Sequence, residues 1–112
     1  MVKKYIPEQG DIVFFDFNPS KGHEQKGYRP AIVISNVVFN KNTKLAMVCP
    51  ISSNEKKFPT HYVLKNGKKI NGAVLCEHIR SIDYETRSLK FIEKVEGEDF
   101  LNVMALLDAC IV

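Results

Sequence analysis

The amino-acid sequence predicts a mainly β protein, a small antiparallel barrel that ends in one α-helix. Short segments rich in β-branched and aromatic residues alternate with turns that contain Gly, Pro, Asn or Asp, and the apolar residues change to helical spacing from Gly97 onward. The segments are not separated by repeated helical patterns of about 10 to 15 residues, which disfavours parallel βαβ units. At 112 residues the chain has the size of one domain, so we expect residues 1–112 to form a single domain.

Six segments are expected to be strands. The first is Ile12–Phe17, which has turn residues on both sides. The others have similar composition and are Ala31–Ser35, Leu45–Cys49, His61–Leu64, Ala73–Cys76 continuing toward Ile82, and Leu89–Val95. Asn66-Gly67 predicts a hairpin turn before the fifth of them.

The C-terminal segment is expected to be an amphipathic helix. Its apolar residues fall on one helical face and are Phe100, Val103, Met104, Leu107, Cys110 and Ile111. Glu98 and Asp99 lie in the first turn, where carboxylates suit the positive end of the helix dipole. We expect this face to pack against the barrel, or in part to meet a second subunit.

Composition excludes several classes of protein. Apolar residues make up 45% of the chain and charged residues 26%, which is typical of a soluble globular protein and not of a disordered one. The net charge of +3 permits an anionic partner without requiring one. The apolar stretches, such as Ala31–Ile34, are far shorter than the roughly 20 residues that cross a bilayer, and Met1–Gly10 lacks the apolar core of a signal peptide. We therefore expect a cytoplasmic protein with no membrane contact.

The sequence gives no sign of a metal or cofactor site. Three cysteines are widely spaced with no C-x-x-C pair, which predicts reduced and mostly buried thiols. His23, His61 and His78 show no metal-ligand spacing. There is also no phosphate-binding P-loop, no G-x-G-x-x-G and no G-x-S-x-G.

Two polar connections are long for a domain of this size, and long loops tend to be functional. The first, Asn18–Tyr28, leads into Arg29-Pro30 at the entrance of an apolar strand. Proline holds the preceding residue in an extended conformation, so the Arg29 guanidinium would project from the end of the strand. The alternative is that Arg29 only pairs with Glu24 or another surface acid.

The second connection, Ser52–Thr60, opens with two hydroxyl side chains. Ser52 and Ser53 follow Pro50-Ile51 at the end of the third expected strand, where they would be exposed. The alternative is ordinary turn chemistry, since serine often hydrogen-bonds nearby backbone groups after a strand.

Taken in order, these segments closely resemble the MazF/PemK family of bacterial toxin endoribonucleases. The motifs that carry the resemblance are Gly10-Asp11, the run Pro19-x-Lys21-Gly22-x-Glu24-Gln25-x-Gly27-x-Arg29-Pro30-Ala31, Pro50-Ile51-Ser52-Ser53, Phe58-Pro59-Thr60-His61, and the segment from Gly72 to Asp83. The Gly-x-Glu-Gln-x-Gly-x-Arg-Pro run is specific, and the weaker motifs support it by their order and spacing.

The resemblance implies an SH3-like antiparallel barrel of the MazF/PemK/CcdB type, a homodimer, and metal-independent cleavage of single-stranded RNA or mRNA at short sequence motifs. It further implies 2′,3′-cyclic phosphate and 5′-hydroxyl products, inhibition of translation, and a cognate MazE-like antitoxin. The family's catalytic arginine falls on Arg29 and its catalytic threonine on Ser52, which keeps the hydroxyl and lacks the methyl group.

The chemistry of these residues fits that role. Attack of a ribose 2′-oxygen on its own phosphate needs a base, donors for the charged phosphorane and an acid for the leaving oxygen. Arg29 stays protonated and is assigned to the phosphorane, while Ser52 donates a hydrogen bond to the same phosphate. Glu24 is the nearest candidate base in the sequence, and pairing with Arg29 is its alternative role.

Further residues on the two connections are candidates for RNA binding. The substrate-binding candidates are Lys21, Gln25, Lys26, Tyr28, Ser53, Lys56 and Lys57. Lysines would contact the phosphate backbone, Gln25 a base edge, and Tyr28 an unpaired base. Alternatively, these are solvated loop residues.

Two other functions were weighed. A non-enzymatic toxin on the same barrel, similar to CcdB, would bind a topoisomerase and would not need Arg29 with Ser52. An SH3-like peptide-binding adaptor would need an exposed aromatic groove, whereas the aromatic residues here fall mostly inside expected strands.

Overall fold

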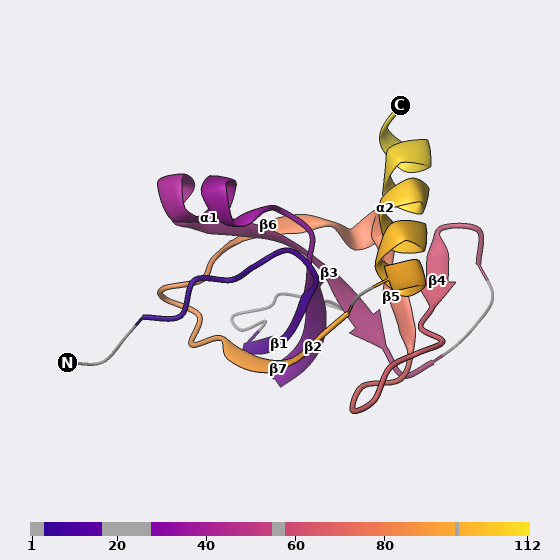
Figure 1. Ribbon diagram of the computed structural model, residues 1–112, viewed down its shortest axis with the longest axis horizontal. Helices are drawn as coiled ribbons and strands as arrows, with labels where there is room; N and C mark the ends of the chain where they lie inside the picture. Colours follow the sequence, from indigo (N-terminus) through magenta and orange to yellow (C-terminus); the bar gives the residue numbers. More distant parts are fainter. Residues whose placement is uncertain (1–3, 17–27, 55–57, 96) are drawn as a thin grey trace, which may run out of the picture.

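The structure, a computed structural model, describes residues 4–16, 28–54, 58–95 and 97–112, with the side chains of Asp16 and Tyr28 excepted (Figure 1). Its strands are β1 (Asp11–Asp16), β2 (Tyr28–Val33), β3 (Leu45–Ser52), β4 (His61–Val63), β5 (Ala73–Leu75), β6 (Arg80–Asp83) and β7 (Lys90–Lys94). Its helices are α1 (Val37–Thr43), the single 3-10 turn η1 (Cys76–His78) and α2 (Gly97–Ile111).

The strands form one antiparallel sheet in the order β4-β5-β3-β2-β1-β7, with β6 also paired to β3. β3 is the central strand, because it pairs with β2 along one edge and with β6 and then β5 along the other. The mainly β antiparallel fold with a C-terminal helix is therefore confirmed. Within the described ranges no pairing joins β4 to β7, so the sheet is barrel-like but not closed.

The expected fifth strand is divided into β5, η1 and β6. β6 pairs with Leu45–Val48 of β3, and β5 pairs with Ile51 and Ser52, so two separate strands share one edge of β3. The chain turns between them at η1, where the backbone N–H of Cys76 donates to the Thr60 carbonyl. Strand composition alone does not reveal such a turn, because it is set by which residues of β3 each segment pairs with.

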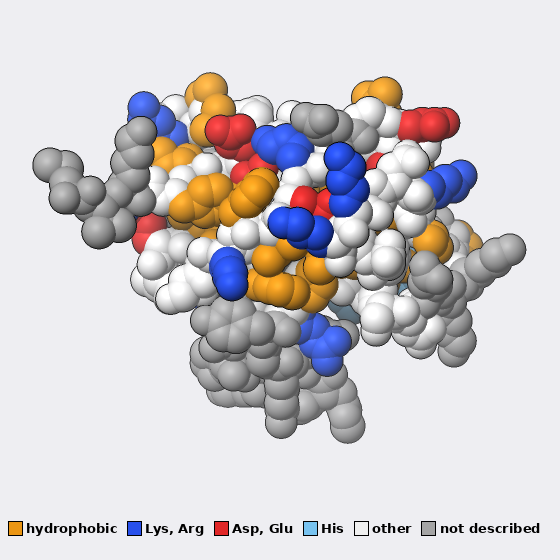
Figure 2. All heavy atoms as spheres, turned by 60° about the horizontal axis from the view of Figure 1, so that its bottom comes forward, with side chains coloured by type: hydrophobic (Ala, Val, Ile, Leu, Met, Phe, Trp, Pro, Cys, Tyr) orange, Lys and Arg blue, Asp and Glu red, His pale blue; other side chains and the backbone are white. Residues whose placement is uncertain are grey.

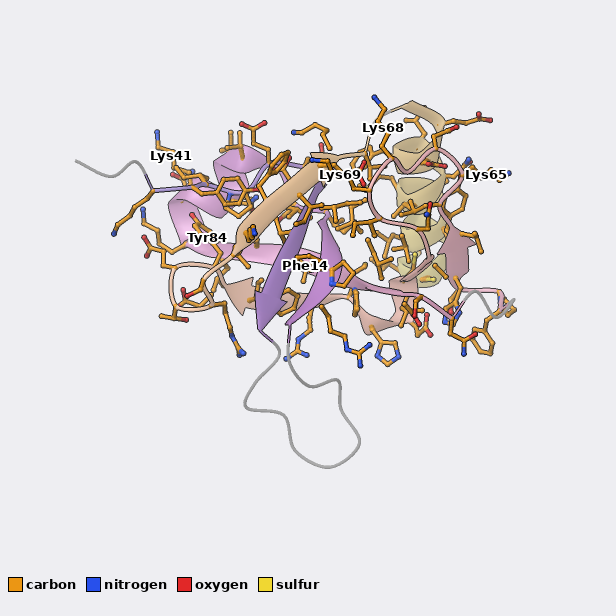
Figure 3. The ribbon with its side chains drawn as sticks, turned by 90° about the horizontal axis from the view of Figure 1, so that it is seen from below. Phe14, Lys41, Lys65, Lys68, Lys69 and Tyr84 are labelled. Carbon is orange, nitrogen blue, oxygen red and sulfur yellow. The ribbon has the colours of Figure 1, made fainter. Side chains whose placement is uncertain are left out.

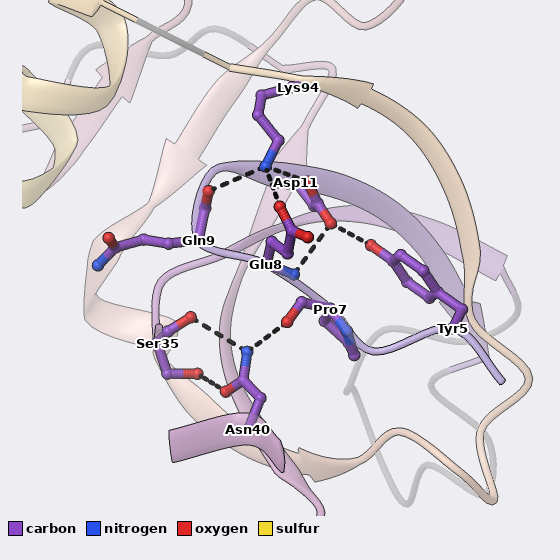
Figure 4. A network of polar contacts seen from close by, with 8 residues as sticks. All are labelled: Tyr5, Pro7, Glu8, Gln9, Asp11, Ser35, Asn40 and Lys94. Carbon is purple, nitrogen blue, oxygen red and sulfur yellow. Dashed lines mark hydrogen bonds and ion pairs between the residues drawn. The ribbon is translucent and has the colours of Figure 1, made fainter. Parts of the chain in front are cut away.

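The sequence did not predict α1. The Asn36 side chain caps its first turn by accepting a 2.9 Å hydrogen bond from the Phe39 N–H, and Lys44, with φ 62°, ends it. Asn40 on this helix is fully buried, and its amide donates to the carbonyls of Pro7 at 2.8 Å and Ser35 at 3.1 Å (Figure 4). These long-range contacts hold a seven-residue helix that is too short to be stable alone.

The sheet has apolar side chains on both faces. Alternate strand residues point to opposite faces, so Val13, Ala31 and Val48 join one buried cluster while Ile12 and Ile32 join the other. The second cluster includes Val103 and Leu107 of α2, which stands beside β4 and β5 (Figure 1). The sheet core therefore fixes both the strand register and the position of α2.

The C-terminal helix differs from expectation at its end. Val103 and Leu107 are buried as predicted, whereas Cys110 and Ile111 are exposed. The other two cysteines, Cys49 and Cys76, are buried free thiols, in agreement with the prediction of mostly buried thiols. No helix in the described part of the chain is long and apolar enough to span a membrane.

Two carboxylates hold the loop between β4 and β5. Asp99 of α2 accepts hydrogen bonds from the backbone N–H groups of Lys65 and Asn66, and Glu93 of β7 accepts from those of Lys68, Lys69 and Ile70. The labelled lysines of this loop, Lys65, Lys68 and Lys69, lie away from the start of β2 (Figure 3). Asp99, expected only to favour the helix dipole, thus also binds the loop to the helix.

Candidate active site

Arg29, near the start of β2, and Ser52, at the end of β3, belong to the same end of two neighbouring antiparallel strands. Ala31 of β2 pairs with Pro50 of β3, and Ile32 pairs with Cys49. Arg29 comes two residues before Ala31, and Ser52 comes two residues after Pro50, where β3 pairs with β5. The two residues, distant in the sequence, thus meet at the same end of the sheet.

Their side chains share one face of the sheet. Arg29 has the same parity as Ala31 on β2, and Ser52 has the same parity as Val48 on β3. Ala31 and Val48 belong to the same buried cluster, and cross-strand partners point to the same side. Arg29 is exposed and Ser52 half-buried, so the guanidinium and hydroxyl lie beyond the end of that cluster, where a substrate can reach them.

The Ser52 hydroxyl is oriented by the chain that follows it. Its Oγ accepts a 3.1 Å hydrogen bond from the Asn54 N–H, which is the turn interaction considered as its alternative role. Accepting this bond leaves the hydroxyl proton free to donate to a phosphate oxygen. Ser53, the next residue, is exposed. The turn interaction and a substrate contact are therefore compatible.

Gly72 allows β5 to approach Ser52 closely. Ser52 pairs with Ala73, and a Cβ atom on Gly72 would lie 2.3 Å from the Ser52 carbonyl oxygen. Gly72 also has φ +146°, which L-amino acids rarely adopt. Gly72, which was not predicted to belong to the site, therefore allows β5 to lie close to the backbone of Ser52.

Most of the other predicted site residues lie outside the described part of the chain. They are Lys21, Glu24, Gln25, Lys26, Lys56 and Lys57. The backbone of Tyr28 begins β2, and its side chain is not described. The roles of these residues stay predictions.

A second polar cluster, which we call the Glu77 cluster, consists of Thr60, His61, Glu77 and His78. The Thr60 hydroxyl donates to Glu77 Oε1 at 2.7 Å, and His61 Nε2 lies 2.6 Å from Glu77 Oε2. His78 Nε2 lies 3.8 Å from the same oxygen. Pairing of β4 with β5, in which His61 lies opposite Leu75, brings these residues together.

The Glu77 carboxylate is held in its ionised form. Burial alone would raise the pKa of Glu77, but hydrogen bonds from Thr60 and His61 stabilise the charge and give a net lowering. An ionised carboxylate only accepts hydrogen bonds. The cluster thus presents a fixed acceptor at the molecular surface.

The sequence analysis gave no role to this cluster. His61 lies 16 residues before Glu77, a separation with no recognisable motif. Only strand pairing makes them neighbours, and the sequence signal is that His61 and Glu77 each lie in a segment that carries the family resemblance. In the described ranges, no group of three or more His, Cys, Asp or Glu side chains has the geometry to hold a metal ion.

The face shown in Figure 2 carries Lys and Arg side chains around exposed hydrophobic areas. Such a surface has cations for an anionic backbone and apolar groups for contact with bases. Acidic side chains also lie on this face, in agreement with the modest net charge of +3.

The mainly β antiparallel sheet with a C-terminal helix is also the fold of solved toxin structures. Residues 8–111 match the family described as PemK-like, MazF-like toxin of type II toxin-antitoxin system. The chain is 32% identical over 111 residues to endoribonuclease toxin MazF of Escherichia coli K12, covering 99% of each chain. It is 36% identical to endoribonuclease EndoA of Bacillus subtilis, covering 70% of this chain and 72% of that one.

Solved structures agree with this match. MazF from Deinococcus radiodurans is 32% identical with a TM-score of 0.86, covering 96% of this chain and 98% of that chain. A MazE-MazF structure from the same organism gives 28% identity and a TM-score of 0.83, covering 96% and 97%. The chain therefore belongs to the PemK/MazF toxin family of type II toxin-antitoxin systems. The expected family and the expected class of enzyme, an endoribonuclease, are confirmed by these matches.

Proposed function

We propose that this toxin cleaves single-stranded RNA without a metal ion, by attack of a ribose 2′-oxygen on the adjacent phosphate. The observation that supports the proposal is the antiparallel pairing of β2 with β3, because a register continued beyond Ala31–Pro50 would bring Arg29 and Ser52 together on one face of the sheet. The relatives named endoribonuclease support RNA as the substrate.

Each group has a role in the step. The 2′-oxygen forms a bond to phosphorus and gives its proton to a base, for which Glu24 is the proposed residue. Arg29 and Ser52 donate hydrogen bonds to the phosphorane oxygens, where negative charge develops. The bond from phosphorus to the 5′-oxygen breaks, and that oxygen takes a proton, with Arg29 as the proposed donor. The products are a 2′,3′-cyclic phosphate and a 5′-hydroxyl.

The proposed RNA contacts lie on both sides of this pair. Lys21, Gln25, Lys26 and Tyr28 precede β2, and Ser53, Lys56 and Lys57 follow β3. Both segments adjoin Arg29 or Ser52 in the sequence, and their proposed role is to contact one strand of RNA. Cleavage at a short sequence motif in mRNA would stop translation.

Two protein partners belong to the proposal. The MazE-MazF structures from Deinococcus radiodurans support a cognate antitoxin. A second copy of this chain is proposed because α2 leaves Leu101 and Ile111 exposed, at 68% and 71%, beyond its packed face. The protein would act in the cytoplasm, where mRNA is translated.

The test uses the purified toxin, free of antitoxin, and a long RNA in EDTA. We expect cleavage, with cyclic phosphate and 5′-hydroxyl ends found by end-group analysis. A 2′-deoxy nucleotide at the cut site should block it, because the nucleophile is missing. Intact RNA with a folded toxin would instead favour the CcdB-like alternative, a toxin that binds a topoisomerase.

A further inference from the structure

Two buried cysteines meet where one edge of the sheet divides. Cys49 lies on β3 and is fully buried, and Cys76, the first residue of η1, is 1% exposed. Ile51 pairs with Val74 in the antiparallel ladder of β3 and β5, and each cysteine lies two residues away from one of these partners along the chain. All four side chains belong to the same buried cluster. The two thiols therefore converge in one part of the core.

The two thiols contact each other, and they are not equivalent. The Cys49 thiol donates a hydrogen bond to the Cys76 sulfur, and this bond lowers the pKa of Cys76 against the opposing effects of burial and of the Glu77 carboxylate. The same bond, together with burial, raises the pKa of Cys49. Cys76 is therefore the thiol that more readily becomes a thiolate, which is the nucleophilic form, and Cys49 is a second thiol directly beside it.

The backbone around Cys76 can move more easily than the backbone around Cys49. η1 is a single turn, held where the Cys76 N–H donates to the Thr60 carbonyl at 3.1 Å and the Ile79 N–H donates to the Cys76 carbonyl at 3.3 Å. β3 is instead paired along both edges. Local opening costs least where few backbone hydrogen bonds must break, so η1 opens before β3 and admits a small oxidant to Cys76. On closing, the sulfurs need only approach to about 2.05 Å to form a disulfide.

We propose that Cys49 and Cys76 are a reversible oxidation site, at which hydrogen peroxide converts the two thiols into a disulfide that fastens η1 to β3. The Cys76 sulfur attacks one peroxide oxygen and the O–O bond breaks, which gives a sulfenic acid and, with the Cys76 proton, one water molecule. The Cys49 sulfur then attacks the Cys76 sulfur, and the hydroxyl group leaves with the Cys49 proton as a second water molecule. The thiols lose two electrons and two protons, and the peroxide takes up both.

The disulfide ties together two segments that the fold otherwise joins only by non-covalent contacts. Cys76 directly precedes Glu77 of the Glu77 cluster, and Cys49 lies on the strand that ends at Ser52. Because the bond closes a long loop, it restricts the unfolded chain and stabilises the folded one. Thiol reductants reverse it, so the site responds to peroxide without permanent damage. This inference depends on the packing of the core and not on the proposed cleavage of RNA.

The test treats the folded, reduced protein with hydrogen peroxide, blocks the remaining thiols in denaturant, and maps the peptides by mass spectrometry without reductant. We expect a disulfide between Cys49 and Cys76 that dithiothreitol removes. Cys110 is exposed on α2 and is the alternative partner, so Cys110→Ser is treated in parallel and should form the same bond. The proposal fails if Cys49 and Cys76 stay free while Cys110 is oxidised, if either pairs with Cys110, or if Cys110→Ser forms no internal disulfide.

The thermal unfolding temperature is a second readout. Peroxide treatment of Cys110→Ser should raise it by on the order of 10 °C, because the new bond closes a long loop. The matched control adds Cys76→Ala to Cys110→Ser, which leaves Cys49 without a partner thiol, and it should show no rise. Circular dichroism before treatment checks that the control is folded. An equal rise in the control, or an unchanged temperature in a protein that carries the bond, would contradict the proposal.

Discussion

The Tyr62 hydroxyl donates a 2.7 Å hydrogen bond to Asp99 Oδ1, joining β4 to the first turn of α2 across 37 residues. The same carboxylate accepts from the backbone N–H of Asn66 at 2.8 Å. Asp99 is 2% exposed, so these donors would be left without an acceptor if the carboxylate were lost. This one side chain therefore connects the C-terminal helix to the hairpin that carries His61.

Asp99→Asn should lower the free energy of unfolding at pH 7 by about 2 to 3 kcal/mol, because the new amide group faces backbone donors. Urea denaturation measures the change. The neighbouring exposed Glu98→Gln is the control, with an expected effect below about 0.5 kcal/mol. Equal losses in the two variants would show that the buried network contributes no specific stability.

The Asp99 variant should also change the response to acid. Burial alone raises the pKa of Asp99, but hydrogen bonds from Tyr62, Asn66 and Lys65 outweigh it and the pKa is lowered. The stability contributed by this group is present above the unfolded aspartate pKa of about 3.9 and is lost as pH falls through the lower folded value. The thermal unfolding temperature, measured from pH 6 to pH 2, should therefore fall less steeply in Asp99→Asn than in the parent protein.

Lys94→Met tests the buried carboxylate of Asp11. Lys94 Nζ lies 2.9 Å from Asp11 Oδ1 and 3.1 Å from Glu8 Oε1, and Tyr5 donates to the other Asp11 oxygen (Figure 4). The Asp11 side chain is 3% exposed, whereas the Lys94 side chain is one-third exposed. We therefore expect Lys94→Met to lower the free energy of unfolding by about 2 to 3 kcal/mol, which is less than the loss on breaking a fully buried ion pair. Chemical denaturation should show this loss in Lys94→Met and little change in the exposed Lys90→Met.

High pH should act on the same ion pair. Burial alone lowers the pKa of Lys94, but the hydrogen bonds that its ammonium donates to Asp11 and Glu8 outweigh this effect and raise the pKa. Stability from this group is fully present below the unfolded lysine pKa of about 10.4 and is lost as pH rises through the higher folded value. Above pH 10, the thermal unfolding temperature should fall more steeply in the parent protein than in Lys94→Met.

Gly72→Ala should disturb both stability and cleavage. The added Cβ would meet the Ser52 carbonyl at 2.3 Å, so β5 or the catalytic strand end must shift. Gly97→Ala is a matched control, because Gly97 has φ +65° but no atom within 4 Å of an added Cβ. Gly97→Ala should lower the free energy of unfolding by about 1 kcal/mol, from backbone strain alone. Gly72→Ala should lower it by more and should also reduce kcat. If the two variants have equal kcat values, the position of β5 does not control the Ser52 hydroxyl.

Arg29 and Ser52 should respond differently to conservative changes. Arg29→Ala should lose about 2 to 4 kcal/mol of transition-state stabilisation, which is roughly 30-fold to 1,000-fold in kcat/KM. Arg29→Lys should retain only part of the parent kcat/KM, because an ammonium group does not reproduce the planar fork of a guanidinium. Ser52→Thr should retain activity, since the hydroxyl remains and a β-branched residue suits a strand, whereas Ser52→Ala should lose it. The exposed Lys41→Ala on α1, far from β2, is the control (Figure 3).

The sequence by itself determined the strand pattern, the C-terminal helix and the family, because these depend on local periodicity and on the specific run around Arg29. The roles of Arg29 and Ser52 stay predictions from the sequence. Tertiary structure alone decided that β2 pairs with β3, that Gly72 lies close to the Ser52 carbonyl, and that the expected fifth strand divides at η1. It also brought Thr60 and His61 to Glu77. The physical reason is that strand register and close packing join residues far apart in the chain, and no spacing along the sequence encodes which strand will lie beside which.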